Sequence, residues 1–521
     1  MADPTVDADK PADDLQAHYL GIIEAYDKRY RDWKIRCEKL AKLYTYATRH
    51  EGSRTRKMAV LWSNVQTLKS AIYSRCPEPE VGRRFRDDDP VGKAASEIME
   101  RAIAYTFDDS KFDRVMRLVR DDYLLAGRGN AWPRYEPDFD DLTDDEGNLL
   151  SDDGEKIADD DKETKPGQEL ADERVKHDFV GWRDFGHNIA RNWQEVRQVW
   201  RIVYMSRREG VKRFKDVFKD VPLDWKSGDL TDEKSSETSA KSQARVYEIW
   251  DKSRGKVVFV AKAAKRVLEE IDPPIKYGDF FPCPEPVYGT THAESMIPVP
   301  DYVFYQDQVE EIDDLTARIG ALTDSLKLAG LYQSTSTEAS DAIVQLAKPG
   351  VENVLIPVPN WAQFKEGGGT KGMIEWWPVE KVVEVLQECF AARKQIIEDV
   401  YQITGLSDIM RGQGDPDETA AAQHIKSQWG SLRVRDRQHE MARFARDMAR
   451  KTAEIIAQQF SPETLMRMTN IKLPTQAEVE QQQLMAQIEA QRQAQMQQMQ
   501  QMQQQAPPMG NNGGPPMQGA M

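Results

Sequence analysis

The sequence predicts an α+β protein that is mainly helical, and three observations support this prediction. Long helical patterns with one apolar face fill the N-terminal quarter and the C-terminal half of the chain. Short aromatic and β-branched stretches, which suit strands, gather between residues 130 and 300. With 521 residues and a hydrophobic content of 40%, the chain can bury real cores and has room for roughly three domains.

The composition favours a folded protein without a membrane segment. The chain has no run of roughly eighteen apolar residues, so we expect no transmembrane helix, and its polar first residues are unlike a signal peptide. Cys37, Cys76, Cys283 and Cys389 are far apart and form no metal-like pair. We therefore expect reduced thiols, no metal site and no cofactor.

One segment sets the charge of the protein. The formal net charge is −16. Residues 138–163 hold thirteen acidic residues against Lys156 and Lys162, a net of −11, which leaves only −5 for the rest of the chain. With Gly147 or Gly154 at position six of a calcium-binding loop, position one would be a leucine, so a calcium loop is excluded. A solvated acidic hairpin tip is the better prediction.

The first 130 residues are predicted to form helices. Residues 1–14 are polar, and we expect them to be disordered. One helix is expected over 15–47 and a second over 58–75, which ends before Pro77. Helical pattern resumes over 91–126 and stops at the glycines that follow.

Strands are expected where the periodicity changes. Residues 130–137 and 174–185 are aromatic and β-branched, and an acidic hairpin insertion at 138–172 joins them. Further short strand-like and helical segments continue to about residue 300. Residues 15–300 are therefore predicted to form an α+β domain.

Two long helices of similar length are predicted next. Residues 302–330 repeat apolar residues at steps of three and four, and 379–405 carry a matching stripe. At 1.5 Å per residue they would span about 44 Å and 40 Å. Residues 331–378 predict a small α/β insertion at the tip of this helical hairpin. The stripes that pair the two helices are Ile312, Leu315, Ile319, Leu322 and Leu326 on the first and Val382, Leu386, Ile396 and Val400 on the second.

The second of these helices has an additional apolar stripe at Val379, Val383, Phe390 and Ile397. Two stripes on one helix predict burial against more than one neighbour. The residues alone leave two interpretations open. The helix lies either inside a monomeric core or between adjacent copies of the chain.

A glycine-rich connector leads into a third long helix, expected over 417–460. Arg411-Gly412-Gln413-Gly414 needs a permissive backbone and carries one cation, and the acids and proline of 415–418 form a strong helix start. Between Gln423 and Lys451 the helix has eight basic and three acidic residues, a net of +5. It either contacts phosphates or forms ion pairs and a solvated face, and the residues alone favour the second interpretation.

The end of the chain has low complexity. A helix rich in Gln and Met is expected within 461–505, because these residues tolerate helix well. It would stop at Pro507-Pro508, and residues 506–521 are expected to be disordered.

No motif indicates an enzyme. The glycine-rich run at 367–372 lacks the spacing of a phosphate-binding loop, and motifs of serine hydrolases, zinc proteases and redox thiol pairs are absent from the sequence. His177 and His187 are ten residues apart with no third ligand suggested, which argues against a metal site. We therefore expect no catalytic residues.

One tract resembles a known family. The sequence ITGLSDIMRG, followed by the connector and by TAAAQHIKSQWGSLRVRDRQ, resembles the core of portal proteins, the head-to-tail connectors of tailed bacteriophages, of the podovirus type. The segments SNVQTLKSAIYSRCPEPEVGRRF and WRDFGHN resemble other parts of the same family. The resemblance covers residues 60–460 and is most specific at 395–450, whereas the acidic insertion and the Gln/Met-rich tail depart from it.

The resemblance implies a portal fold. The α/β wing would comprise 15–300, the stem helices 301–330 and 379–405, the clip 331–378, the tunnel loop 406–416, the long wing helix 417–460 and the crown 461–505. It also implies that Arg411, Gly412, Gln413 and Gly414 project into a DNA channel, with Asp324 and Lys327 as further candidates to face the DNA.

The resemblance further implies a function. The chain would form a ring, usually a dodecamer, through which double-stranded DNA is packaged and later ejected. Its partners would be the terminase large subunit, head-completion or tail adaptor proteins, and the major capsid and scaffolding proteins, but no membrane. Such a ring assembles in the bacterial cytoplasm and resides in the virion. The alternatives are another head–tail adaptor or minor head protein without a channel, or a DNA-processing enzyme.

Overall fold

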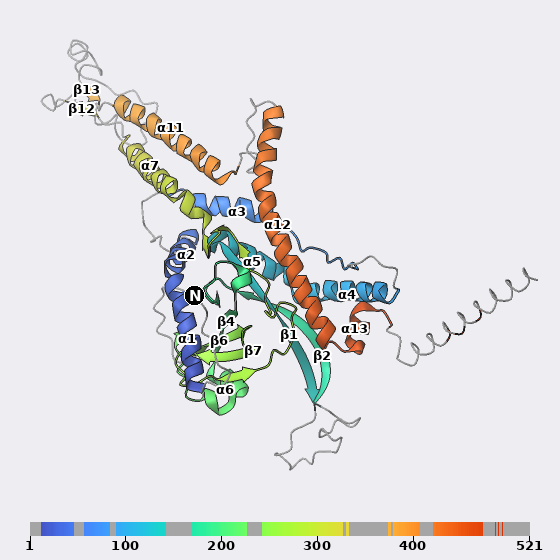
Figure 1. Ribbon diagram of the computed structural model, residues 1–521. Coiled ribbons are helices and arrows are strands. Elements are labelled where there is room, and N and C mark those ends of the chain that lie inside the picture. The colour runs from blue at the N-terminus through green and yellow to red at the C-terminus, as the bar shows by residue number, and fades with distance from the viewer. Residues whose placement is uncertain are drawn as a thin grey trace, which may run out of the picture. The chain divides into compact units, whose positions relative to one another are not determined.

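The computed structural model describes residues 12–45, 57–83, 90–141, 168–226, 242–326, 330–332, 374–376, 379–406 and 420–472, together with Met485, Ile488 and Arg492. Helices and strands are mixed, which confirms the predicted α+β class (Figure 1). The chain divides into two compact units. The first comprises Met1–Glu80 and Thr106–Gln459, and the second comprises Val81–Tyr105 and Phe460–Met521.

The first unit begins with two helices where one was predicted. α1 (Ala12–Arg29) starts inside the segment expected to be disordered, and α2 (Arg31–Tyr44) follows after a break at Tyr30. The N–H of Tyr30 donates to the carbonyl of Tyr26 at 2.9 Å, so a helical hydrogen bond is kept at the break. One buried stripe runs through both helices and comprises Leu15, Tyr19, Ile23, Tyr26, Tyr30, Trp33, Cys37 and Leu40.

Three more helices follow where helical pattern was expected. They are α3 (Val60–Ile72), α4 (Pro90–Asp109) and α5 (Phe112–Ala126). Lys111 separates the last two because it adopts a left-handed conformation, with φ of 53°. Gly127 ends α5 with φ of 77°, and its N–H donates to the carbonyl of Tyr123.

A long two-stranded ribbon leaves the end of α5. β1 (Arg128–Asp141) pairs antiparallel with β2 (Gln168–Val180), and β9 (Val287–Tyr288) joins the other edge of β1. The pairing extends from Asn130 opposite Val180 to Asp141 opposite Gln168, with a register shift after Asp138. The flanks of the predicted acidic insertion are therefore strands, and its centre lies outside the described residues.

A second antiparallel sheet completes the core of the first unit. Its order is β3-β4-β6-β7-β8, and α1 and α2 cover it with aromatic residues that pack against Trp200, Ile249 and Val258. The short helix α6 (Arg207–Phe214) begins at a capping box. The strands are β3 (Phe185–His187), β4 (Gln198–Met205), β5 (Trp225–Lys226), β6 (Ser242–Asp251), β7 (Lys256–Ala261) and β8 (Glu269–Ile271), with the separate hairpin β10 (Thr290–His292) and β11 (Ser295–Val299).

Three long helices end the first unit. α7 (Gln306–Ser325) and α11 (Val379–Thr404) lie side by side and run in opposite directions (Figure 1), and α12 (Ala420–Gln459) contacts α3 and β1. α7 is shorter than the helix predicted over 302–330. Asp301–Phe304 forms a 3-10 helix before it, and the regular helix ends with the C-cap Leu326. Of residues 331–378, the structure describes only parts of the strand pair β12 (Gly330–Tyr332) and β13 (Ile374–Trp376).

The second unit joins distant parts of the sequence. α13 (Pro462–Thr469) is capped by Ser461, and the Arg101 guanidinium donates to the carbonyl of Thr469 at 3.1 Å. Residues 81–105 were predicted to belong to the domain of 15–300, and no local pattern in the sequence indicates that they group with the C-terminal residues. Most of the predicted Gln/Met-rich helix and the whole of 506–521 lie outside the described residues. None of the helices in the described ranges is long and apolar enough to cross a membrane.

Candidate functional site

α7 and α11 form a helical rod, which we treat as the candidate functional site. Ile312 and Ile319 of α7 are buried, as are Ile396 and Val400 of α11. Cys389 is buried on the same face of α11. The other residues predicted to pair the two helices are only half-buried: Leu315, Leu322, Leu326, Val382 and Leu386.

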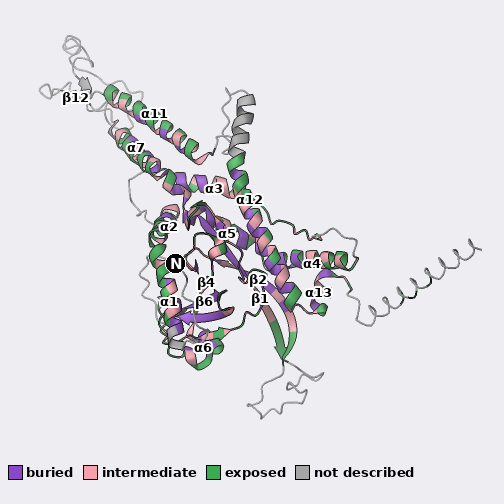
Figure 2. Ribbon diagram, viewed as in Figure 1, coloured by how far each residue is buried: buried purple, intermediate pink, exposed green. Residues whose placement is uncertain are grey.

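The additional stripe of α11 is only partly covered by the part of the chain that the structure describes. Val383 is 37% exposed and Phe390 is 44% exposed, while Val379 and Ile397 are half-buried. Figure 2 shows the contrast between this rod, where exposed and intermediate residues dominate, and the buried sheet region of the same unit. α11 thus presents apolar surface on a second side, away from its contact with α7.

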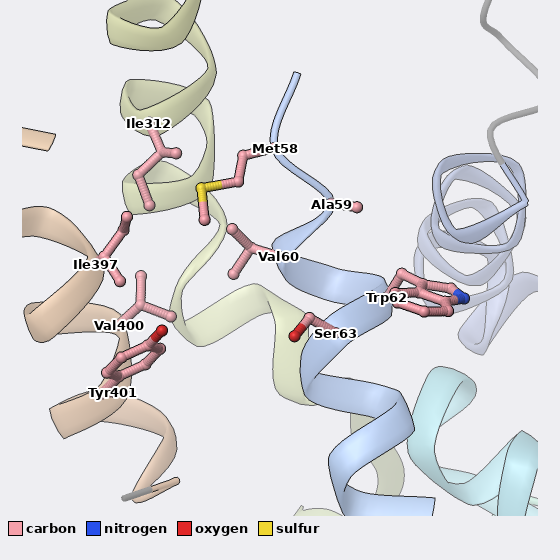
Figure 3. Close-up of a pocket in the computed structure, with 9 residues that line it drawn as sticks. All are labelled: Met58, Ala59, Val60, Trp62, Ser63, Ile312, Ile397, Val400 and Tyr401. Atoms are coloured by element: carbon pink, nitrogen blue, oxygen red, sulfur yellow. The ribbon is translucent and has the colours of Figure 1, made fainter. Parts of the chain in front are cut away.

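An apolar groove lies at the base of the rod, where α3 meets it. It has a volume of about 240 Å³ and lies between the start of α3, α7 and the end of α11. In Figure 3 the Met58 and Val60 side chains approach Ile312, Ile397 and Val400 across this space, whereas Trp62 points away from it. Met58 is 40% exposed and Trp62 is 49% exposed.

This groove was not among the features that the sequence predicts. The available signal was the apolar run from Met58 to Trp62, where Trp62 lies off the buried stripe of α3. The run is separated by more than 250 residues from Ile312 and more than 330 from Ile397. Nothing in the sequence indicated that these segments meet.

The α7 face that is not packed is acidic. Asp307, Glu310, Glu311, Asp314 and Asp324 are exposed, against a single exposed cation, Arg318. Asp313 differs from them, because its carboxylate accepts from the N–H of Met58 at 2.8 Å and lies 3.7 Å from the Lys57 ammonium. Burial raises the pKa of Asp313, although these two groups stabilise its charged form. The predicted DNA-facing residue Asp324 is thus solvent-accessible, and Lys327 lies outside the described residues.

Several cations of α12 bind groups of the same chain. Arg437 lies 2.6 Å from Asp301, and Arg443 donates to the carbonyls of Glu285 and Pro286 at 3.1 and 3.0 Å. Lys451 pairs with Asp279. These contacts join the helix to the segment before β9 and to the 3-10 helix Asp301–Phe304, which favours the ion-pair interpretation of its charge. Among the basic side chains of the helix that the structure describes, Arg433, Arg435, Arg446 and Arg450 are exposed, and Arg433 donates to the carbonyl of Ile403 at 3.1 Å.

The two histidines considered as ligands lie in hydrogen-bonded cores. His177 Nδ1 lies 2.7 Å from Ser110 Oγ, and its Nε2 lies 2.9 Å from Thr452 Oγ1. His187 Nε2 lies 3.2 Å from the Tyr30 hydroxyl. Burial lowers the pKa of each histidine to about 3, so both are neutral at pH 7. Among the described residues, no group of three or more potential ligands could hold a metal ion.

The predicted tunnel loop Arg411–Gly414 and most of the predicted clip lie outside the described residues. The site is therefore the rod, its open apolar stripe, the acidic face of α7 and the groove at its base. No protein-family model matches this chain, and neither does any curated protein sequence.

Proposed function

We propose that this chain is a portal subunit. Copies of it would form a ring around an axial channel that passes double-stranded DNA at one vertex of a tailed-bacteriophage capsid. The observation that carries the proposal is the α7–α11 rod, which buries one apolar stripe within the chain and leaves a second one, with Val383 and Phe390, open. In this proposal α7 and α11 are the stem, and α12 is the long wing helix.

An open apolar stripe on a rod supports packing against another rod. Val383, Phe390 and Ile397 recur at steps of seven, which is the spacing with which one helix presents residues to another. Contiguous exposed apolar surface commonly marks an interaction site. When two different faces of identical subunits meet, the contact propagates from copy to copy and closes into a ring if the rotation permits.

The acidic face of α7 supports a channel wall that does not hold DNA. Double-stranded DNA carries one negative charge per roughly 1.7 Å, so several strong cationic contacts on each subunit would trap it. The exposed acids of α7 would repel phosphates that come within roughly 8 Å, the screening length at physiological salt. The ring is passive in this mechanism, and the terminase large subunit hydrolyses ATP.

The remaining partners follow from the family resemblance. Residues 331–378 would receive the terminase during packaging and head-completion or tail adaptor proteins afterwards, while the capsid and scaffolding proteins hold the ring in place. The loop Arg411–Gly414 would guide DNA. Its deletion is expected to leave ring assembly intact and to impair DNA packaging or retention, whereas loss of the ring would contradict a tunnel-loop role.

Electron microscopy of the full-length protein tests the proposal. We expect negative-stain images of closed rings with an axial hole, and a native mass that is an integer multiple of 59.6 kDa. A stable monomer, or an oligomer without a hole, would contradict the proposal and favour an adaptor or minor head protein. Incubation with DNA and Mg²⁺ checks the enzyme alternative, for which cleavage would be the diagnostic result.

A further inference from the structure

The groove at the base of the rod has an aromatic counterpart on the same chain. Phe304 lies in the 3-10 helix immediately before α7 and is 51% exposed, whereas its neighbours Tyr302 and Tyr305 are buried. Phe304 does not line the groove. The base of the rod therefore presents an apolar hollow and a projecting phenyl ring on two separate patches.

The hollow suits a phenyl ring in size and in chemistry. An engineered apolar cavity of roughly 150 Å³ in another protein binds benzene. The groove, at about 240 Å³, is larger, and its walls are mainly the apolar side chains of Met58, Val60, Ile312, Ile397 and Val400 (Figure 3). An apolar ring that enters it removes apolar surface from water on both partners, which is favourable in proportion to the area.

The groove is continuous with the open stripe of α11. Ile397 lines the groove and is also the next residue after Val383 and Phe390 in the seven-residue repeat. From Val383 to Ile397 the stripe extends for about 21 Å at 1.5 Å per residue. Its occupant is therefore expected to be a rod-like helical partner, not a small molecule.

A second copy of this chain supplies such a partner. In the described part of the first unit, α5 buries seven residues, and α12 buries Val434, Met441, Phe444, Met448, Ile455 and Ile456, so both are already packed. Compared with α5 and α12, which expose only Leu118 and Leu432 among their described large apolar residues, the rod of α7 and α11 exposes Val383 and Phe390 on one stripe, and Phe304 lies at its base. Two copies placed side by side at the same level would bring one base against the other.

We propose that Phe304 of one copy inserts into the groove of the next, between Met58 and Ile397, and anchors the contact between adjacent subunits. This inference rests on the proposed ring and names its contact. Because the projecting residue and the hollow are different patches, the contact is head-to-tail and repeats around the ring. Buried aromatic residues of this kind commonly carry a large part of an interface's binding energy.

A cross-linking experiment with two full-length variants tests the contact. Met58→Cys and Phe304→Cys are each made in a Cys76→Ser background, because Cys76 is the one native cysteine that is not buried. One variant carries a larger tag, so that mixed and like pairs separate on a gel. The two are mixed, assembled and treated with a short bis-maleimide. The control is Ile35→Cys on α2, which is 55% exposed.

We expect mixed dimers of the Met58→Cys and Phe304→Cys chains in at least fivefold excess over like pairs and over pairs with the Ile35→Cys control. Like pairs of Met58→Cys would indicate a two-fold contact and overturn the inference. The absence of mixed dimers from a preparation that shows rings would overturn it too, while leaving the proposed function intact. Mixed dimers in a preparation without rings would support the contact between Phe304 and the groove but contradict the proposed function.

An assembly measurement provides a second, independent check. Phe304→Asp is expected to raise the protein concentration for half-assembly at least tenfold, while Phe304→Leu changes it less than threefold. Phe304 is 51% exposed before assembly, so both variants are expected to fold. Far-UV circular dichroism of each variant checks that the subunit is folded. Equal assembly of the two variants would exclude Phe304 as the anchor.

Discussion

α5 and α11 are both amphipathic helices, but they differ in how completely the chain covers them. α5 buries seven of its fifteen residues, whereas α11 buries only Cys389, Ile396 and Val400 among twenty-six. α5 packs against α3, β1 and β2, while the main neighbour of α11 is α7. Apolar burial supplies most of the favourable free energy of folding. The region around α5 therefore contributes more to the stability of the fold than the rod does, and in the proposed function the open stripe of the rod is available for contacts between subunits.

A buried cation in the first region joins several of its elements. The Arg128 guanidinium is fully enclosed and donates to the Tyr26 hydroxyl at 2.9 Å and to the carbonyls of Trp182 and Phe185 at 2.9 and 3.0 Å. It also lies 4.7 Å from the centre of the Trp33 ring. This residue joins α1 and α2 to the turn before β3. No comparable buried anchor is present in the described part of the rod.

Replacement of Arg128 is expected to have the largest effect on the subunit. Arg128→Ala leaves three buried acceptors without their donor and opens a cavity, so the free energy of unfolding should fall by about 3–5 kcal/mol. Arg134→Ala is the matched control, because Arg134 is a partly exposed arginine in the same strand, and its effect should stay below about 1 kcal/mol. Chemical denaturation measures both, and equal effects would contradict a central role for Arg128.

A change on the open stripe is expected to spare the fold and disrupt assembly. Phe390→Glu places a charge on the proposed subunit contact, and the concentration for half-assembly should rise at least a hundredfold, which corresponds to about 2.8 kcal/mol. Lys381→Glu is the control, because Lys381 is exposed and, nine residues before Phe390, lies on the opposite side of α11. Light scattering measures assembly, and thermal unfolding of the dissociated subunit should be unchanged. If Phe390→Glu made the subunit less stable and left assembly normal, the open stripe would stabilise the fold and not the contact between subunits.

Low pH is expected to reduce the free energy of unfolding of the first unit, because its buried histidines are neutral in the folded state and bind protons on unfolding. The folded pKa of His177 is about 3, below the ordinary value of 6.5, so the unfolded chain binds more protons between these values. Stability should therefore fall as pH drops below about 6.5, by about 2 kcal/mol for His177 alone at pH 5. His177→Gln should reduce this pH dependence. Chemical denaturation from pH 7 to pH 5 measures this dependence. If the free energy of unfolding changed equally with pH in His177→Gln and in the unmodified protein, the prediction would be wrong.

Asp122 is expected to produce a pH dependence of stability of opposite sign. Burial raises the pKa of Asp122 to about 7, although the N–H of Trp182 and the Arg128 guanidinium stabilise its charged form. The stability that the protonated carboxyl provides is present at low pH and is lost as pH rises from about 4 through 7. The shift corresponds to about 4 kcal/mol between pH 4 and pH 8, so Asp122→Asn should stabilise the subunit by up to about that amount at pH 8, with little gain at pH 4. A larger gain at pH 4 than at pH 8 would show the sign to be wrong.

Periodicity was sufficient to predict the α+β class and the approximate positions of the long helices. The break at Tyr30 could not be predicted, because the buried stripe continues through it without a change of step. The left-handed conformation of Lys111 could not be predicted either, because no glycine marks that position. The grouping of 81–105 with the C-terminal unit depends on long-range contacts such as that between Arg101 and Thr469, which leave no local pattern.

The candidate site was predictable only in part. Heptad spacing identified the rod, the pairing stripes and the additional stripe of α11, but not how deeply each residue of a stripe is buried, because that depends on how the two helices are rotated against each other. The groove and Phe304 were missed, since their surroundings are assembled from segments far apart in the sequence. The tunnel-loop residues Arg411–Gly414 stay a prediction, because they lie outside the described residues.

The pairing of β1 with β2 also has a practical consequence. Asp141 is the cross-strand partner of Gln168, so the acidic segment of residues 142–167 begins and ends at neighbouring positions, about 5 Å apart in such a pair. Its length can therefore change without altering the strand register beneath it. A fluorescent protein or an affinity handle inserted there would label every subunit at an equivalent point, which allows copies to be counted on single particles.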